Sequence, residues 1–210
     1  MSSTRISGIS IVGAGGFARE VLFLLDRLGK VAHVRGLYES DNVWKKRRVA
    51  GFDVLPLSRL DQSGGELILA IGDPAVRKSL RESLSGNIRY PTLIDPAAII
   101  SRCADIGDGV IVCAGAIITT DVVIGHHVHL DRSVNVGHDC HLGHYVTVAP
   151  GAVISGNCQI GTSAYIGAAA CLRERVSIGE RALVGMGAVV VKHVPADKIH
   201  AGNPARELPR

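Results

Sequence analysis

Aliphatic residues recur at every sixth position through the second half of the chain. In steps of six from Ile94 to Val190, all seventeen positions hold Ile, Leu or Val, and the residue four positions after each is Ala, Val or Cys. A large aliphatic residue, a turn and a small inward residue make one rung of a β-solenoid, and no helical period fits the pattern. We therefore predict a β-solenoid over residues 94–195. Glycine follows the aliphatic residue eight times and indicates a tight turn there, at Gly107, Gly125, Gly137, Gly143, Gly161, Gly167, Gly179 and Gly185.

The first ninety residues follow a different pattern, in which apolar strands alternate with helical segments. A strand is predicted at Ile9–Val12, a helix at Arg19–Leu28 and a second strand at Val31–Leu37. A third strand, Leu67–Ile71, runs into a turn, after which Pro74 begins a helix that extends to Leu84. Alternating strands and helices predict a small Rossmann-like α/β domain with a parallel sheet.

The two patterns divide the chain into an α/β domain over residues 1–90 and a solenoid domain with a C-terminal cap over residues 91–210. A chain of 210 residues is long enough for two small domains with their own cores. The 25 glycines and the low aromatic content of 4% favour an aliphatic, tightly turned architecture.

Charge, hydropathy and cysteine content exclude several classes of function. The net charge is +4 and the basic residues are scattered apart from Lys45–Arg48, so we expect no nucleic-acid partner. The side chains of that cluster are either solvated on a surface loop or face the phosphates of a nucleotide ligand. No apolar run is long enough to span a bilayer, and Met1–Ser10 lacks the features of a signal peptide. Five cysteines without a C-x-x-C pair favour reduced thiols, so we expect a cytoplasmic protein.

The segment Gly13–Ala18 matches G-x-G-x-x-A between the first predicted strand and the first predicted helix. Such a turn brings the backbone close to a phosphate and aims a helix N-terminus at it. An NAD site would add an acidic residue about twenty positions later, where Glu39 comes late, and ninety residues are few for a dinucleotide fold. We therefore favour a nucleotide-phosphate site, with a purely structural turn as the alternative.

His138 is the main candidate for catalysis. It follows Gly137 at the third position of its hexad, where its side chain faces outward, whereas Val136 and Cys140 point inward. A neutral imidazole accepts a proton near pH 7, and the neighbouring carboxylate of Asp139 orients the ring or stabilises its cation. The alternative is a solvated surface histidine.

The arrangement of a G-x-G domain, hexapeptide repeats and an H-[DE]-C segment resembles the sialic-acid O-acetyltransferase and bacillosamine N-acetyltransferase family. The resemblance covers nearly the whole chain. It implies a left-handed β-helix with three hexads in each triangular coil, five to six coils over residues 94–195, a homotrimer, and acetyl-CoA as co-substrate. It also implies that His138 is the general base and that Asp139 assists it.

The same resemblance assigns further residues to ligands. It implies a nucleotide-sugar in the α/β domain, with Glu39 or Ser40 near the base, and acetyl-CoA along the solenoid at a subunit boundary. The residues implied for the substrate are Gly13, Gly15, Gly16, Phe17, Glu39, Ser40, Gly72, Asp73 and Asp131. Those implied for acetyl-CoA are Gly156, Ala168, Met186, Asn203 and Arg206, the last two within a terminal G-x-P-A-[KR] segment that also caps the solenoid.

Two features depart from the family pattern. Related sequences often have Asn at the position of Asp131 and His at the position of Thr147, so the identity of the acceptor stays open. The second strand ends in Tyr38–Asp41 rather than in paired aspartates, so the sequence does not decide between uridine and guanosine.

Other histidines and cysteines have simpler interpretations. His126 and His144 lie eighteen residues apart and are expected to stack on adjacent coils; a zinc site is conceivable, but stacked surface residues are the commoner case and we expect no metal. Cys140 and Cys158 have the same spacing at inward positions, where core packing is favoured over a nucleophilic role.

These observations predict an acetyl-CoA-dependent N-acetyltransferase that acts directly on a UDP- or GDP-linked amino sugar in the biosynthesis of bacterial surface glycans. The alternatives are sugar O-acetylation, a zinc-dependent lyase, or a non-catalytic trimeric assembly protein on the same solenoid.

Overall fold

The computed structural model describes residues 8–209, which form two compact units. The first comprises residues 8–72 and 79–91, and the second comprises residues 73–78 and 92–209. The helix α2 (Pro74–Ser83) is therefore divided, with its first turn in the second unit. Within residues 8–209, no helix has the length and apolar character that a bilayer crossing requires.

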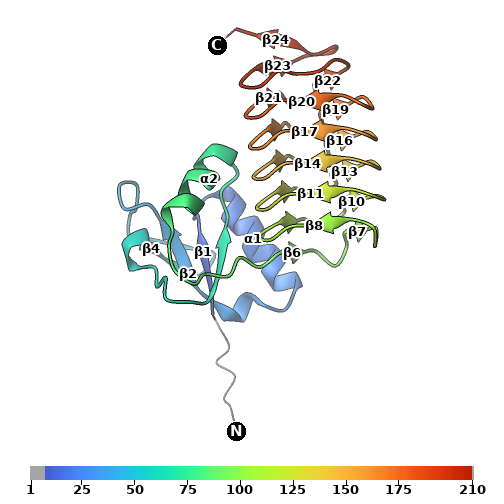
Figure 1. Cartoon of the computed structure of the whole chain (residues 1–210). Coiled ribbons are helices and arrows are strands. Elements are labelled where there is room, and N and C mark those ends of the chain that lie inside the picture. Colours follow the sequence, from blue (N-terminus) through green and yellow to red (C-terminus); the bar gives the residue numbers. More distant parts are fainter. Residues whose placement is uncertain (1–7, 210) are drawn as a thin grey trace. The chain divides into compact units, whose positions relative to one another are not determined.

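The first unit is built on a five-stranded sheet with the order β3-β4-β2-β1-β5 (Figure 1). All neighbours are parallel except β3 and β4, which form an antiparallel hairpin. The helix α1 (Gly16–Arg27) buries Val21, Leu22 and Leu25 on one side, as its apolar spacing predicts. The strands are β1 (Ile9–Val12), β2 (Val34–Glu39), β3 (Arg48–Val49), β4 (Phe52–Pro56) and β5 (Glu66–Leu69), and short 3-10 helices occupy Val31–His33 and Leu57–Arg59.

The predicted elements of this unit are present, with shifted ends. The second strand begins at Val34 rather than Val31 because a 3-10 turn precedes it, and it continues to Glu39. The hairpin of β3 and β4 was not predicted, since β3 has only two residues and shows no alternation. The parallel α/β architecture is confirmed.

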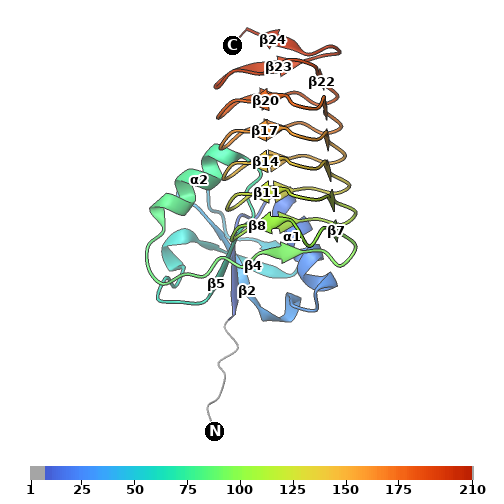
Figure 2. The ribbon, with the colours of Figure 1, turned by 45° about the vertical axis from the view of Figure 1, so that its right-hand side comes forward.

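The second unit is a parallel β-helix of stacked triangular coils (Figure 2). The first face consists of β7 (Ile99–Ile100), β10 (Ile117–Ile118), β13 (Asn135–Val136), β16 (Val153–Ile154), β19 (Cys171–Leu172) and β22 (Val189–Val190). The second face consists of β8 (Asp105–Ile106), β11 (Val123–Ile124), β14 (His141–Leu142), β17 (Gln159–Ile160) and β20 (Ser177–Ile178). The third face consists of β6 (Leu93–Ile94), β9 (Ile111–Val112), β12 (His129–Leu130), β15 (Thr147–Val148), β18 (Tyr165–Ile166), β21 (Leu183–Val184), β23 (Ile199–Ala201) and the antiparallel β24 (Arg206–Leu208).

Residues eighteen apart pair on adjacent coils, as the register Leu142↔Ile160 illustrates. Three hexads therefore make one coil, as the family resemblance implied. The corner between the first and second faces is called the His138 corner, that between the second and third faces the His144 corner, and that between the third and first faces the Met186 corner.

The interior of the β-helix is a single column of aliphatic side chains. The large residues at hexad ends, such as Leu142, Val148 and Ile154, are 0–1% exposed, and the small residues fill the inner corners. Each buried methylene contributes about 0.8 kcal/mol, so burial of this column is the main stabilising interaction of the unit.

The eight glycines that follow an aliphatic residue of the repeat serve close packing between coils rather than an unusual backbone angle. A Cβ at Gly137 would lie 2.7 Å from the backbone nitrogen of Gly156 on the next coil, and the other glycines of this set meet similar obstacles. The left-handed backbone instead occurs two residues later, as at Asp139 and Asn157, and recurs every six residues from Gly109 to Gly187. The turn predicted at the glycine is thus displaced by two positions.

Replacement of Leu142 by Ala should lower the free energy of unfolding by about 2–5 kcal/mol, because the column cannot close around the lost volume. Val123→Ala, on the outer side of the neighbouring coil and 40% exposed, should change it by about 0.5 kcal/mol or less. Urea denaturation followed by circular dichroism checks both variants. Equal effects would contradict the single-column core.

Candidate active site

The His138 corner holds an imidazole paired with a carboxylate. Nδ1 of His138 lies 2.6 Å from Oδ2 of Asp139, and the two side chains are 57% and 53% exposed. An ionised carboxylate only accepts hydrogen bonds, so this contact places the proton on Nδ1 and leaves the lone pair of Nε2 for a substrate. The outward position predicted for His138 is confirmed.

The backbone of the corner fixes this pair. Asp139 has a φ of +57°, a conformation that Asp tolerates better than most residues, and its N–H donates to the carbonyl of Thr120 on the preceding coil. The carbonyl of His138 accepts from the N–H of Asn157 on the following coil. Both residues are therefore held by hydrogen bonds between coils.

Gly156 lies directly against the imidazole of His138. A Cβ built on Gly156 would lie 2.5 Å from Nε2 and 2.6 Å from Cε1 of His138, so only glycine leaves the ring its observed position. The family resemblance assigned Gly156 to acetyl-CoA. The structure places it with His138 and Asp139, and the three form one cluster.

The Met186 corner holds most of the other residues assigned to acetyl-CoA. Ala168 and Met186 are stacked on adjacent coils, and Met186 is 80% exposed. The turn that contains Asn203 covers the end of the same corner, since the carbonyl of Gly202 accepts a hydrogen bond from the N–H of Val189. Arg206 is exposed and begins the final strand.

Asp131, which was assigned to the substrate, lies on this corner in an earlier coil, where Arg132 pairs with its carboxylate at 3.3 Å. These residues gather at one edge, separated from His138 by the first face.

The residues predicted to bind phosphate lie around the carboxyl end of β1. Gly13 has a φ of +119° and needs to be glycine, because a Cβ would collide with the carbonyl of Ala70. A Cβ at Gly15 or Gly16 would meet nothing within 4 Å, so open space lies above this turn. Gly15 is the N-cap of α1 and makes no side-chain cap hydrogen bond, and half-buried Phe17 lies in the first turn. The exposed N-terminus of α1 suits an anionic ligand.

The second predicted phosphate segment begins α2. The carboxylate of Asp73 accepts from the N–H groups of Ala75 and Val76 at 2.8 and 3.0 Å. Asp73 is thus a helix cap. A Cβ at Gly72 would meet nothing within 4 Å.

The end of β2 holds the residues assigned to the nucleotide base. Glu39 forms a two-pronged ion pair with Arg47, with Nη2–Oε1 at 2.6 Å and Nη1–Oε2 at 2.7 Å. The carbonyl of Ser40 accepts from Val43 and Trp44. The sequence analysis did not single out Arg47 from its basic cluster, because the pairing depends on the unpredicted hairpin.

Thr147, one of the two departures from the family pattern, is buried beneath Arg77. Within the second unit, the Arg77 side chain is fully buried and its Nη2 lies 2.9 Å from Oγ1 of Thr147 and 2.7 Å from the carbonyl of Tyr145. Its Nε donates to the carbonyl of His127 at 3.0 Å. Burial lowers the pKa of Arg77 to about 9, which still leaves it protonated at neutral pH. Arg77 was not predicted, since no local pattern marks it.

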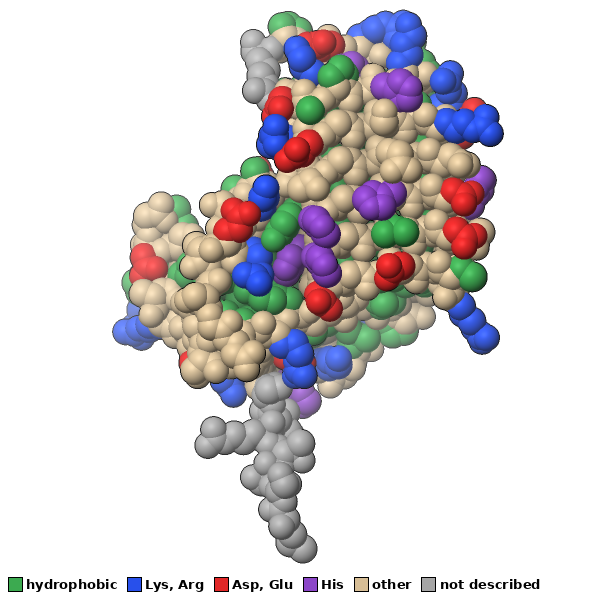
Figure 3. Space-filling view, in the orientation of Figure 1, with side chains coloured by type: hydrophobic (Ala, Val, Ile, Leu, Met, Phe, Trp, Pro, Cys, Tyr) green, Lys and Arg blue, Asp and Glu red, His purple; other side chains and the backbone are tan. Residues whose placement is uncertain are grey.

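Histidine side chains gather on the solenoid (Figure 3). The rings of His126 and His144 stack at 5.0 Å, and Nδ1 of each accepts a backbone N–H from the preceding coil. Burial, followed by the charges of His126 and His141, lowers the pKa of His144. A groove of about 300 Å³ runs along this corner and the second face. Within residues 8–209, no group of three or more His, Cys, Asp or Glu side chains has the arrangement of a metal site.

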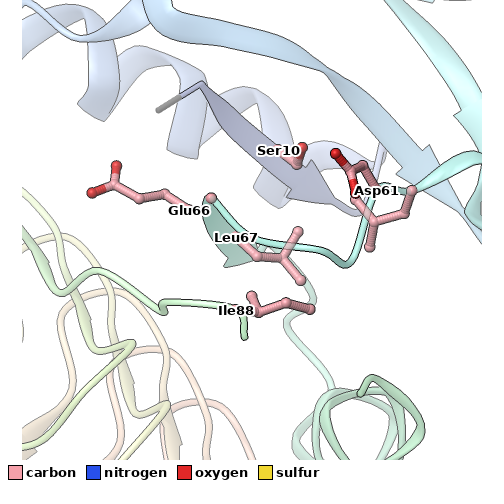
Figure 4. A pocket seen from close by; sticks show the side chains of 8 residues that line it. Ser10, Asp61, Glu66, Leu67 and Ile88 are labelled. Atoms are coloured by element: carbon pink, nitrogen blue, oxygen red, sulfur yellow. The ribbon is translucent and has the colours of Figure 1, made fainter. Parts of the chain in front are cut away.

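A smaller hollow in the first unit is lined by Ser10, Asp61, Glu66, Leu67 and Ile88 among others (Figure 4). Its volume is about 10 Å³, roughly the room for one water molecule. It lies at the amino ends of β1 and β5, whereas nucleotides bind at the carboxyl ends of parallel strands. It is therefore not the nucleotide site.

Segments of both units match the models of known protein families. Residues 8–84 match the PglD N-terminal domain, and residues 121–156 match the bacterial transferase hexapeptide (six repeats). The acetyltransferase domain of PglB from Neisseria gonorrhoeae, solved with acetyl coenzyme A, is 32% identical over 96% of this chain and 99% of that chain, with a TM-score of 0.84. This chain belongs to the hexapeptide-repeat acetyltransferases with a PglD-type N-terminal domain.

Two further solved structures support the assignment. WeeI from Acinetobacter baumannii is 32% identical over 96% of this chain and 99% of that chain, with a TM-score of 0.85. A histidine-to-asparagine variant of perosamine N-acetyltransferase from Caulobacter crescentus, in complex with CoA and GDP-perosamine, is 29% identical over 98% of both chains, with a TM-score of 0.87. A comparison with curated protein sequences found no match. The chain is therefore an acyltransferase, and the left-handed β-helix implied by its hexapeptide repeats is confirmed.

Gly156→Ala should displace the imidazole of His138 and lower kcat by about tenfold to a hundredfold, because a shift of about 1 Å in a reacting group has effects of this size. The melting temperature should stay within a few degrees of wild type. Thr120→Ala, at the equivalent position one coil before His138, is the matched control and should keep full activity. Equal kcat values of the two variants would show that the position of the His138 imidazole does not affect catalysis.

The stacked histidines should make stability depend on pH. Since the folded pKa of His144 lies below its ordinary value of 6.5, its contribution is present above that pH and is lost as the pH falls through the lowered value. Protonation also removes the acceptor for the N–H of His126. His144→Thr, which copies Thr162 in the same column, should flatten the fall in melting temperature between pH 7 and pH 5. His33→Thr, outside the solenoid, should leave it unchanged; parallel curves for wild type and His144→Thr would exclude this role.

Proposed function

We propose that this protein transfers the acetyl group of acetyl-CoA to the amino group of a nucleotide-linked amino sugar, with His138 as the general base. The observation that supports this most directly is the His138–Asp139 pair, which leaves Nε2 unprotonated on an exposed corner. The solved relatives are consistent with it. Perosamine N-acetyltransferase was solved with CoA and GDP-perosamine in variants that replace one histidine by Asn or Ala.

The reaction needs no acyl-enzyme. The amino nitrogen attacks the thioester carbonyl, Nε2 of His138 takes a proton from that nitrogen, and collapse of the tetrahedral intermediate breaks the C–S bond. The CoA thiolate leaves and takes the proton from the imidazolium, which returns His138 to its neutral form. Asp139 stabilises the imidazolium that forms in between, and backbone N–H groups of the coil corners are suited to the oxyanion.

A homotrimer would complete the site. The outer side of the first face is apolar in five of six coils, where it consists of Ile99, Ile117, Val153, Cys171 and Val189, and Ile99 is 65% exposed. Such a stripe favours association with further copies of the chain. The His138 corner and the Met186 corner border this face on opposite sides. In a closed ring packed through this face, the His138 corner of one protomer would therefore meet the Met186 corner of the next.

The residues around the glycine turn would hold the diphosphate of the substrate, and the Met186 corner with Asn203 and Arg206 would hold acetyl-CoA. We place the enzyme in the cytoplasm, because its five cysteines are free thiols. We also assign it to the biosynthesis of bacterial surface glycans.

The test is acetyl transfer by wild type and His138→Ala with acetyl-CoA and UDP- or GDP-linked amino sugars, followed by thiol release and product mass. Wild type should yield the N-acetylated sugar, and kcat/KM of the variant should fall about a hundredfold or more. His141→Ala, an exposed histidine on the same coil, is the matched control and should be fully active.

Undiminished activity of His138→Ala would remove it from the mechanism. Turnover of sugar hydroxyls but not amines would replace N-acetylation by O-acetylation.

A further inference from the structure

Arg47 is held in place and keeps one edge of its guanidinium open. Nη1 and Nη2 both donate to Glu39, and Nη1 also donates to the carbonyl of Lys45 at 3.2 Å. Its own carbonyl accepts from Val54 N–H, so backbone and side chain are both anchored. Among the described residues, none accepts from Nε–H or from the second hydrogen of Nη2. These two N–H groups are parallel on one edge of the planar guanidinium, and the side chain is 37% exposed.

Arg47 pairs with Glu39, the residue that ends β2, at the edge of the sheet where the glycine turn follows β1. In the register of β1 and β2, Val12 pairs with Tyr38, and Gly13 N–H donates to the carbonyl of Tyr38 at 2.8 Å. Glu39 is the next residue of β2. In this type of domain the diphosphate lies at the turn after the first strand, and the nucleoside extends toward the end of the second. Arg47 is therefore placed near the base rather than the phosphates.

Two parallel donors need two adjacent acceptors. Guanine presents O6 and N7 side by side on one edge, and arginine binds that pair with two hydrogen bonds. Adenine has a donor at N6 beside N7, and in uracil a C–H or N–H group flanks each carbonyl. Glu39 pairs with one edge of the Arg47 guanidinium and leaves the second edge free. The carboxylate therefore positions Arg47 rather than recognising the base itself.

We infer that Arg47, supported by Glu39, binds the O6 and N7 edge of guanine and makes the enzyme selective for GDP-linked over UDP-linked sugars. This inference rests on the proposed function for its substrate class, a nucleotide-linked amino sugar. Arg47 is thus a specificity-determining residue, and Glu39 is a positioning residue.

The first experiment measures nucleotide binding by the full chain through isothermal titration calorimetry, without sugar or acetyl-CoA. GDP and inosine diphosphate share O6 and N7, so their Kd values should agree within about threefold. 7-Deaza-GDP lacks the N7 acceptor and should bind about tenfold more weakly. ADP and UDP should bind at least tenfold more weakly than GDP.

The second experiment uses variants of the pair. Arg47→Lys keeps the charge but loses the two-pronged geometry, so the ratio of Kd for UDP to that for GDP should fall to within about threefold of one. Glu39→Gln should lower the ratio partly, because the amide accepts from only one nitrogen. Arg48→Lys, next in sequence and paired with Asp53, is the control and should keep the wild-type ratio. In acetyl transfer from acetyl-CoA to a GDP-linked amino sugar, Arg47→Lys should raise KM for the sugar and leave kcat within about twofold.

A wild-type protein that binds GDP and UDP equally, or that binds neither, would overturn the inference, as would Arg47→Lys with an unchanged ratio. Preference for GDP over inosine diphosphate would show that the guanine amino group is read instead, which also overturns it. Efficient acetylation of UDP-amino sugars would overturn the inference alone, whereas guanine-selective binding without transfer to any amino sugar would overturn the proposed function alone.

Discussion

The stacking of successive coils through parallel backbone hydrogen bonds is the constraint on which the rest of the structure depends. Each coil lies one strand spacing, about 4.8 Å, from the next, and residues eighteen apart meet at every face. At that distance a Cβ at a hexad glycine such as Gly137 would collide with the next coil, and the inward residues beside the large aliphatic ones are small. It also brings Gly156 against the imidazole of His138 and lets the carbonyl of His138 accept from Asn157. The position of His138, the proposed general base, is therefore set by packing between coils.

Much of this could be predicted from sequence because the repeat is strict. The six-residue period determines which side chains point inward, so the buried positions of Leu142, Cys140 and Cys158 and the outward position of His138 follow from counting. The role of the hexad glycines did not follow, because a glycine that permits close approach and one that permits a positive φ look the same in a sequence. Only the structure separates Gly137, which contacts the next coil, from the left-handed Asp139 two residues later.

Contacts between distant segments were beyond the sequence analysis. Arg77 lies about seventy residues from Thr147, and nothing near either residue marks the pair, yet their hydrogen bond explains how a buried threonine is accommodated there. Arg47 lies in an irregular loop whose path depends on a two-residue strand, so its ion pair with Glu39 had no periodic signal. The repeat thus predicted the scaffold and the outward position of His138, whereas the side chains proposed to distinguish one substrate from another lie in segments without a repeat.

The central claim is that Asp139 holds His138 with its proton on Nδ1, so that Nε2 is free to accept one from the substrate. The tautomer can be read directly from long-range ¹H–¹⁵N correlation spectra of protein labelled with ¹⁵N-histidine, with the signals of His138 identified by their loss in His138→Asn. At a pH where the ring is neutral, the account predicts a protonated Nδ1 and an unprotonated Nε2, and a shift toward mixed tautomers in Asp139→Asn. A wild-type His138 with its proton on Nε2 would contradict the account, since that nitrogen would then have no lone pair for the reaction.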